Sequence, residues 1–285
     1  MKKLAKKLVR SLIERDWSWN LLDKSVLAFA RYADWIRLQS RQATRGGEAP
    51  PASAALLASP TVLHGPFQGM AYDNRLFCCS AIWPKLLGSY EREIHPWLEE
   101  ILRKKYDGII DVGCAEGYYA VGLAWKMPGT PVYAYDVNEA ARTQCRKLAE
   151  ANGVANRVEL RNYCDPDELA RAVGGRKFLV ISDCEGYEKH LFVRENLASL
   201  AQADILIEVH DFMDVTILPH LRELFAATHD VRETESIDDL RKLDRYDYPE
   251  LQGRSIQERY PIIAEWRKRI MIWMYATPKR ATTSG

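Results

Sequence analysis

The sequence lacks several features that would each place it in a particular class of protein. No uninterrupted apolar run is long enough to cross a membrane. The basic first residues lack the apolar core and the cleavage site of a secretory leader. Net charge is also scarce, since the 285 residues sum to +1 and create no overall field that attracts nucleic acid. We therefore expect a cytoplasmic protein without a nucleic-acid partner.

Cysteine is sparse and has no metal-binding spacing. The six cysteines form no C-x-x-C pair and no zinc pattern. Several of them fall in apolar segments or beside a glycine-containing turn, so we expect reduced thiols packed in the interior. The adjacent residues Cys78 and Cys79 leave a redox-active pair open as the alternative.

Charge is distributed unevenly along the chain. Residues 1–46 carry eleven Lys and Arg against four Asp and Glu, and their apolar residues recur at helical spacing. A basic amphipathic helix of this kind packs on its own domain or on a second subunit, or it lies on an anionic membrane surface. We expect a helical extension and linker at residues 1–60, a pre-domain segment at 61–105 and the main domain at 106–285.

The main domain alternates between strand-like apolar runs and helical patterns. Such alternation predicts an α/β fold with a Rossmann-like, doubly wound parallel sheet. Strands are expected at residues 108–113, 131–137, 157–163, 177–183, 203–210, 229–235 and 270–277, and helices at 91–105, 118–127, 139–152, 165–173, 188–200 and 215–227. The charged segment 236–269 lies between the last two strands, and we expect it to act as a lid over a substrate.

Residues 108–137 predict a strand, a tight turn, a helix and a second strand. Small residues at 113–117 let the backbone approach a ligand closely. A dinucleotide site needs G-x-G-x-x-G, but Ala115 replaces the middle glycine and Asp111 would repel a pyrophosphate. Asp111 instead suits a ligand with an amino group and a positive sulfur. Asp136, at the next strand end, can accept hydrogen bonds from both hydroxyls of a ribose.

The turn resembles the S-adenosylmethionine (SAM) turn of the class I methyltransferases. A nicotinamide or flavin cofactor and a plain α/β core without cofactor are the alternatives. If the cofactor is SAM, its binding residues are expected in the turn and at the neighbouring strand ends: Asp111, Gly113, Cys114, Ala115, Glu116, Gly117, Tyr118, Asp136, Val137, Tyr163, Cys164 and Asp183.

Acidic residues gather at the ends of the fourth and fifth predicted strands. Three carboxylates lie within residues 183–188, and residues 207–211 place Glu208 inside an apolar strand before a His-Asp pair. Buried charges are costly unless they are paired or bind a ligand. Individual acids could cap helix N-termini or bond to the backbone. Because the carboxyl ends of parallel strands share one edge, we expect these acids to lie together and to receive the acceptor.

Three motifs carry a resemblance to a known family. DVGCAEGYY, SDCEGYE and IEVHD, within residues 106–212, closely resemble the FkbM-type methyltransferases, which are class I enzymes that O-methylate hydroxyls on natural products and glycans. The family commonly has Asn where this chain has Glu116. The resemblance implies SAM as cofactor, O-methylation of a small-molecule or glycan acceptor, and a Rossmann-like sheet.

The acceptor hydroxyl has to lose a proton, and two routes are open. His210 is our first candidate for the base, oriented by Asp211 or Glu208. Asp183 could serve instead, so the catalytic candidates are His210, Asp183 and Glu208. The second route is a divalent metal that lowers the pKa of the hydroxyl. Its candidate ligands are the hard oxygens of Asp183, Glu185, Glu208 and Asp211.

Three rival functions remain on the sequence alone. A methyltransferase of nucleic acid or protein would share the fold, although base methylation usually uses Asn/Asp-Pro-Pro-aromatic where residues 183–186 read Asp-Cys-Glu-Gly. A non-catalytic scaffold would bind a partner through residues 1–46. A nicotinamide oxidoreductase would bind NAD and would not be stabilised by SAM.

Overall fold

A computed structural model of the protein describes residues 61–72, 81–267 and 269–279. All of them belong to the second of two units, Pro50–Gly285. The predictions for residues 1–60 and for Cys78 and Cys79 lie outside the described residues. Within the described part of the chain, no helix is long and apolar enough to cross a membrane.

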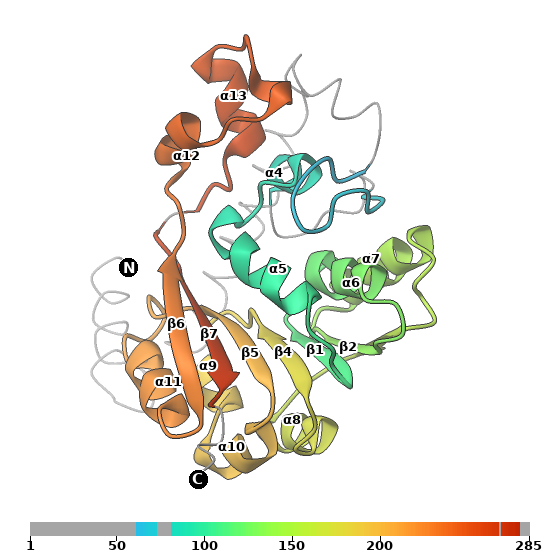
Figure 1. Cartoon of the computed structure of the whole chain (residues 1–285), viewed down its shortest axis with the longest axis vertical. Helices are drawn as coiled ribbons and strands as arrows, with labels where there is room; N and C mark the ends of the chain where they lie inside the picture. The colour runs from blue at the N-terminus through green and yellow to red at the C-terminus, as the bar shows by residue number, and fades with distance from the viewer. Residues whose placement is uncertain (1–60, 73–80, 268, 280–285) are drawn as a thin grey trace, which may run out of the picture. The chain divides into compact units, whose positions relative to one another are not determined.

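The core of the fold is a seven-stranded sheet in the order β3-β2-β1-β4-β5-β7-β6 (Figure 1). The strands are β1 Gly108–Val112, β2 Val132–Tyr135, β3 Val158–Arg161, β4 Phe178–Ser182, β5 Asp204–Val209, β6 His229–Glu235 and β7 Ile272–Pro278. The first five are parallel, and β7 runs antiparallel between β5 and β6. The predicted doubly wound sheet is confirmed, whereas the antiparallel pairing of β6 and β7 was not evident from the sequence pattern.

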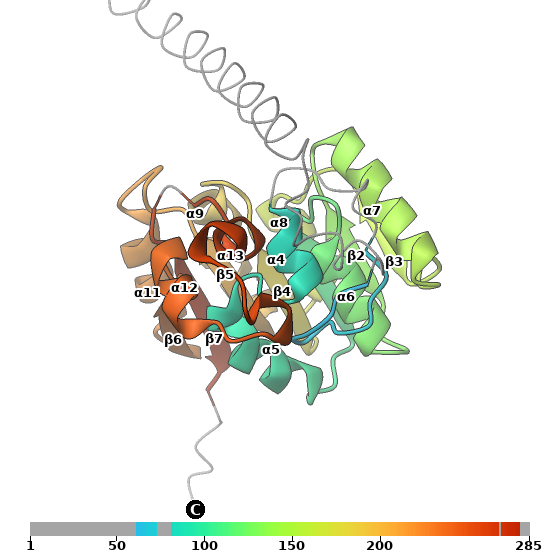
Figure 2. The ribbon, with the colours of Figure 1, turned by 90° about the horizontal axis from the view of Figure 1, so that it is seen from above.

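Helices connect and cover the strands. They are α4 Ile82–Leu87, α5 His95–Leu102, α6 Tyr118–Lys126, α7 Glu139–Ala151, α8 Pro166–Val173, α9 Glu188–Leu191, α10 Arg194–Leu200, α11 Ile217–Phe225, α12 Asp239–Arg245 and α13 Ile256–Ile263, with the short 3-10 helices η2 Arg92–Ile94 and η3 Pro249–Leu251. Figure 2 shows α6 and α7 side by side next to β2 and β3.

The predicted helix boundaries fail in two places. The helix expected at 91–105 begins only at His95, because Pro96 has no N–H to give and suits a first helical turn. The single helix expected at 188–200 is wrong: Phe192 and Val193 are extended between α9 and α10. Fully buried Phe192 there packs on Phe225 of α11, at 5.6 Å between ring centroids. Tertiary packing therefore overrides the helical pattern.

The two faces of the sheet carry separate hydrophobic cores. Strands β1, β4 and β5 are buried along their whole length, which explains their continuous apolar runs. Ile109, Ile181 and Leu206 face the core that contains α5 and α6. Ile110 and Val180 face the opposite core, which contains α8, α10 and α11.

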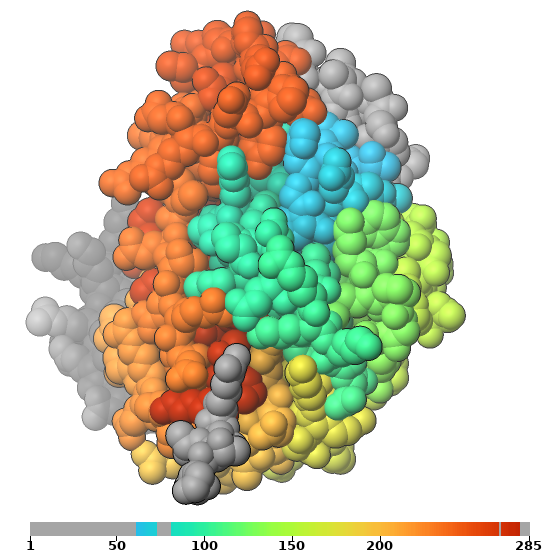
Figure 3. Space-filling model, viewed as in Figure 1, coloured from blue at the N-terminus to red at the C-terminus, as the bar shows by residue number. Residues whose placement is uncertain are grey.

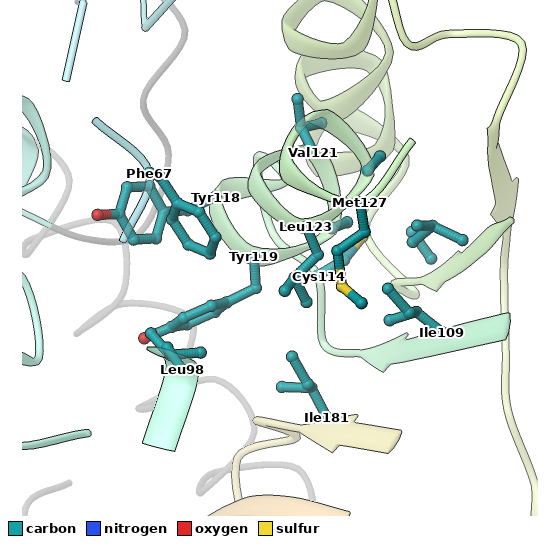
Figure 4. Packing of buried hydrophobic residues seen from close by; sticks show 14 of the residues in the cluster. Phe67, Leu98, Ile109, Cys114, Tyr118, Tyr119, Val121, Leu123, Met127 and Ile181 are labelled. Atoms are coloured by element: carbon teal, nitrogen blue, oxygen red, sulfur yellow. The ribbon is translucent and has the colours of Figure 1, made fainter. Parts of the chain in front are cut away.

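Residues 61–72 and 81–105 pack into the core on the α6 face. Phe67 and Tyr72 belong to the same hydrophobic cluster as β1 and α6. In Figure 4, Phe67 lies beside Tyr118 and Tyr119, and Leu98 of α5 lies below Tyr119. The segment therefore shares its core with the sheet.

Residues 236–271 leave and rejoin the sheet at its carboxyl edge. Glu235 at the end of β6 pairs with Ile272 at the start of β7, and Ile272 also pairs with Val209 at the end of β5. The insertion has its own small core, in which Tyr246 and Ile263 pack with Leu87 of α4. Figure 3 shows its orange surface bordering the blue surface of residues 61–72. The segment predicted as a lid thus lies at the edge where a ligand would bind.

Candidate active site

The turn after β1 is closely packed on both sides. Gly113 and Gly117 have φ angles of 87° and 95°, and Ala115 between them has φ of 46°. A Cβ added at Gly113 would lie 1.8 Å from the carbonyl oxygen of Asp183 at the end of β4. A Cβ at Gly117 would lie 2.5 Å from Sγ of Cys145 in α7. Only glycine fits these two positions, so the turn lies directly against the end of β4.

Asp136 links the end of β2 to this turn. Its Oδ2 accepts a hydrogen bond from the backbone N–H of Ala115 at 2.9 Å, and its Oδ1 accepts from the N–H of Asn138 at 2.8 Å. Each carboxylate oxygen can accept a second hydrogen bond. Asp136 is therefore held in a fixed orientation and still has acceptor capacity for a ribose.

Asp111 is a buried carboxyl group whose hydrogen bonding is incomplete. Its Oδ2 has no hydrogen-bond partner among the described residues. Burial raises the pKa of Asp111 to about 7, a backbone hydrogen bond from Ala120 opposes this rise, and the charges of Asp136 and Glu116 add to it. A buried acceptor without a donor is costly, and a bound ammonium group would supply both the donor and the positive charge.

Two large side chains at the ends of β2 and β3 are open to solvent. Val137 is 71% exposed and Tyr163 is 52% exposed. The phenol oxygen of Tyr163 lies 2.6 Å from that of Tyr187, which follows β4. The edge beside the turn therefore offers an apolar surface of the kind on which a purine base packs.

Four other predicted cofactor residues have buried side chains. Glu116 is fully buried, forms an ion pair with Lys85 and accepts a hydrogen bond from Tyr72 at 2.7 Å. Tyr118 packs edge-to-face on Phe67 at 5.3 Å. The thiols of Cys114 and Cys164 are also buried. The side chains of these residues are therefore packed within the protein, and the Lys85–Glu116 pair ties the turn to α4.

Acids from three neighbouring strands face the same side of the sheet. Asp111, Asp183 and Glu208 each stand two residues after a residue of the α6-side core, so the period-two rule places them on that face. The backbone N–H of Asp183 still bonds to Val112 at 2.9 Å. The sequence-based expectation that these acids lie together is met by Asp183 and Glu208.

His210 is the centre of this group of acids. Its Nδ1 lies 2.6 Å from Oε1 of Glu188, and its side chain is only 3% exposed. Its Nε2 lies 3.5 Å from Asp183 Oδ1, 3.6 Å from Glu185 Oε2 and 3.6 Å from Glu208 Oε2. We refer to these five residues as the acid–histidine cluster.

Opposing effects set the protonation of the cluster. Burial would lower the pKa of His210, but the hydrogen bond to Glu188 and the nearby carboxylate charges raise it above its usual value. Burial raises the pKa of Asp183, and the charge of Glu208 adds to this rise. Burial would also raise the pKa of Glu208, but Arg267 and His210 hold it below its usual value.

Arg267 supplies positive charge that balances the acids at this edge of the sheet. It forms ion pairs with Glu208 of β5 and with Glu91, and its Nε lies 2.9 Å from Glu265. Glu91 also accepts a hydrogen bond from Tyr119 of α6. Arg267 therefore joins the insertion to β5 and to the segment before β1.

Four residues of the cluster were predicted from the sequence, but the residue predicted to orient His210 was wrong. Asp183, Glu185, Glu208 and His210 come together, whereas Asp211 is not among the residues around the histidine nitrogens. The expected orientation of His210 by Asp211 or Glu208 is wrong, because Glu188 bonds to Nδ1. Arg267 was missed. Buried Glu208 signalled a cationic partner, but the sequence does not say which arginine supplies it.

Searches against known proteins add a partial match. No family model matches the chain. Over 79 residues the chain is 38% identical to a release factor glutamine methyltransferase of Chlorobaculum tepidum, a match that covers 26% of this chain and 26% of that protein. The chain thus matches about a quarter of the length of this curated relative.

Solved structures are similar only at low identity. An rRNA methylase of Streptococcus thermophilus has 15% identity and a TM-score of 0.43, with 65% of this chain and 96% of that chain covered. An O-methyltransferase of Bacillus cereus, solved in complex with SAH, has 14% identity and a TM-score of 0.41, with 64% and 77% covered. The strand order described above, with β7 antiparallel between β5 and β6, agrees with the Rossmann-like sheet predicted from the sequence.

Proposed function

We propose that the chain is a SAM-dependent methyltransferase that transfers a methyl group to a hydroxyl of a sugar, a glycan or a natural product. The observation that carries the proposal is buried Asp111 beside the turn after β1, whose Oδ2 has no partner in the described part of the chain. SAM carries a positive sulfur and an amino group, which together satisfy such a carboxylate. The resemblance to the FkbM-type motifs supports oxygen as the methylated atom.

The residues at the carboxyl edge divide the binding of the cofactor among them. Asp111 binds the amino group, the backbone of residues 113–117 approaches the amino-acid part, and Asp136 accepts from the ribose hydroxyls. Val137 and Tyr163 pack against the adenine. Bound SAM would supply a methyl group carried on a positive sulfur. Once the methyl group is transferred, the rest of the molecule is S-adenosylhomocysteine.

The acid–histidine cluster receives the acceptor. Methyl transfer needs the acceptor oxygen, the methyl carbon and the sulfur nearly in line, and holding that geometry removes much of the barrier. The acceptor hydroxyl lies against Asp183, Glu208 and His210, and the cluster takes up its proton. A positioned proton acceptor contributes about 10²–10⁴-fold to the rate. Arg267 keeps Glu208 ionised and ready for this role.

A second candidate is methylation of a protein amide. It is favoured by the 79-residue match to a glutamine methyltransferase. Against it, the segment after β4 places Asp183 and Glu185 around His210, a site with several proton acceptors that suits a hydroxyl better than an amide. A cytoplasmic location stays part of the proposal and is supported by the four cysteines of the described residues, none of which forms a disulfide there.

A product screen tests the proposed acceptor class. The full chain is incubated with SAM and, separately, with sugars, glycans, polyketide alcohols and a glutamine-containing peptide. We expect mass spectrometry to find a methyl ether on an oxygen acceptor, and product lower by about tenfold or more with the Asp111→Asn variant at a low SAM concentration. Methylation of the peptide alone would replace this proposal by the amide methyltransferase.

A further inference from the structure

We propose that Asp183, Glu185 and His210 form a binding site for a divalent cation, for which Mn²⁺ is the probe. The role of this cation in catalysis rests on the proposed function, whereas its binding does not. The site differs from the oxygen-only metal site expected from the sequence, because a histidine nitrogen takes part and Asp211 does not.

The spacing of the ligand atoms fits one ion. One atom from each of the three side chains lies within 4.8 Å of the others. Bonds of about 2.1 Å place neighbouring ligands of an octahedral ion about 3 Å apart and opposite ligands about 4 Å apart. The distances from Nε2 to Asp183 and Glu185, 3.5 Å and 3.6 Å, are therefore close to those of neighbouring ligands. Only small side-chain movements are needed to bind the ion.

His210 is oriented as metal-binding histidines are. Glu188 bonds to Nδ1, which fixes the ring and leaves Nε2 facing the carboxylates. A carboxylate on the far nitrogen is the usual support of a histidine ligand. The side chain is only 3% exposed, so Nε2 faces these carboxylates from the interior of the protein.

A second, independent observation points to a missing ligand. Oδ1 of Asp183 is buried and has no hydrogen-bond partner within the described part of the chain. This is the same atom that lies nearest to Nε2 of His210. An ion bound between this oxygen and Nε2, which lie 3.5 Å apart, would give the oxygen the partner it lacks.

The site is accessible and its charge suits a cation. Glu185 is 83% exposed, so an ion can enter from solvent on that side. Glu185 has φ of 53°, a left-handed backbone that directs its carboxylate back toward His210. On the inner side, Glu208 lies 3.6 Å from Nε2 and its charge is balanced by Arg267. The carboxylates of the cluster other than Glu208 outnumber the positive charges near them, so the site attracts a cation.

The mixture of ligands favours a transition ion over Mg²⁺ or Ca²⁺. Imidazole suits Fe²⁺ and Zn²⁺, carboxylates suit Mn²⁺, and affinity for nitrogen and oxygen ligands rises along the series from Mn²⁺ through Fe²⁺. A cation at this position would polarise the acceptor oxygen and lower the pKa of its hydroxyl. Glu208 then takes the proton, the oxygen forms the bond to the methyl carbon, and the electrons of the broken carbon–sulfur bond stay on sulfur.

Metal titration of the full chain tests the site. The protein is freed of metal with EDTA, dialysed and titrated with MnCl₂ by calorimetry, and unbound Mn²⁺ is counted by electron paramagnetic resonance. We expect one Mn²⁺ per chain. Glu185→Gln, at an exposed position where folding is not at risk, should weaken Mn²⁺ binding by about tenfold or more, and His210→Ala by at least as much.

Asp211→Asn is the matched control, because Asp211 is the neighbouring acid outside the site; its Mn²⁺ affinity should equal that of the wild type. SAM titration of each variant shows that the protein is folded and tests the proposed function separately. If the protein binds Mn²⁺ but not SAM, the proposed methyltransferase function is wrong and the proposed metal site is not affected. No Mn²⁺ binding at millimolar concentration, or equal affinity in Glu185→Gln and the wild type, would overturn the site.

Discussion

Asp111 is the residue whose surroundings are hardest to explain without a ligand. It sits beneath the first turns of α6, is 2% exposed, and has one oxygen without a partner among the described residues. A residue that served stability alone would be better as an apolar side chain at this position. Its retention as a carboxyl group is consistent with a role in binding a positive ligand.

Replacing Asp111 by Asn should change stability in a pH-dependent way. The carboxyl group has a folded pKa of about 7 against an ordinary value of 3.8, so the wild type loses stability as pH rises from about 4 to about 7. Asn does not ionise. The free energy of unfolding of Asp111→Asn, relative to the wild type, should therefore rise over this range by a few kcal/mol, at about 1.4 kcal/mol per pKa unit. Urea denaturation at several pH values measures it; a pH-independent difference would contradict the assignment.

Single residues show what a sequence can and cannot reveal about a site. The acids at strand ends were predictable, because carboxyl ends of parallel strands share an edge. The partner of each acid was not predictable from the sequence. Glu188 bonds to His210, and Arg267, in the insertion, lies 59 positions beyond its partner Glu208 in the sequence. Such pairings depend on how loops close over the sheet, and no local pattern encodes that.

At the scale of elements, the turn after β1 depends on contacts with three others. It packs on β4 through Gly113, on α7 through Gly117 and on α4 through the Lys85–Glu116 pair. The strands were predictable from their apolar runs, whereas the break between α9 and α10 was not, because buried Phe192 determines it. Two predictions test how the turn is held.

Gly113→Ala should destabilise far more than Gly129→Ala. Both glycines have positive φ, of 87° and 94°, but an added Cβ at Gly113 would collide with the Asp183 carbonyl, whereas at Gly129 nothing lies within 4 Å. Gly129→Ala therefore measures only the free-energy cost of placing a Cβ on a left-handed backbone, about 1–2 kcal/mol. We expect a larger loss of unfolding free energy and weaker SAM binding for Gly113→Ala. Equal losses in the two variants would show that the turn is not packed on β4 as described.

Lys85 and Glu116 should couple strongly in a double-mutant cycle. Both side chains are buried, and removing one partner of a buried ion pair costs about 3–5 kcal/mol. Lys85→Met and Glu116→Gln should each destabilise by about that amount, and the double variant by clearly less than the sum. Urea denaturation of the four proteins gives the coupling energy. Additive effects would mean that the pair does not tie the turn to α4.

For the described part of the molecule as a whole, three segments meet at the carboxyl edge of the sheet. The strand ends supply the acids, residues 61–72 and 81–105 support the turn, and the insertion after β6 contributes Arg267. The overall fold follows from the alternation of strands and helices, which the sequence shows clearly. The packing of the insertion on α4 could not be predicted from the sequence, because its residues have no periodic pattern and bury their aromatics in a small local core.

Calorimetric titration of the full chain with SAM, and separately with NAD, tests the central claim most directly. Hydrogen bonds to charged groups contribute about 1.5–3 kcal/mol, so removing the charge of Asp111 should weaken SAM binding by about tenfold or more. We predict one SAM per chain in the wild type, weaker binding in Asp111→Asn and no binding of NAD. Binding of NAD without binding of SAM at millimolar concentration would contradict the account.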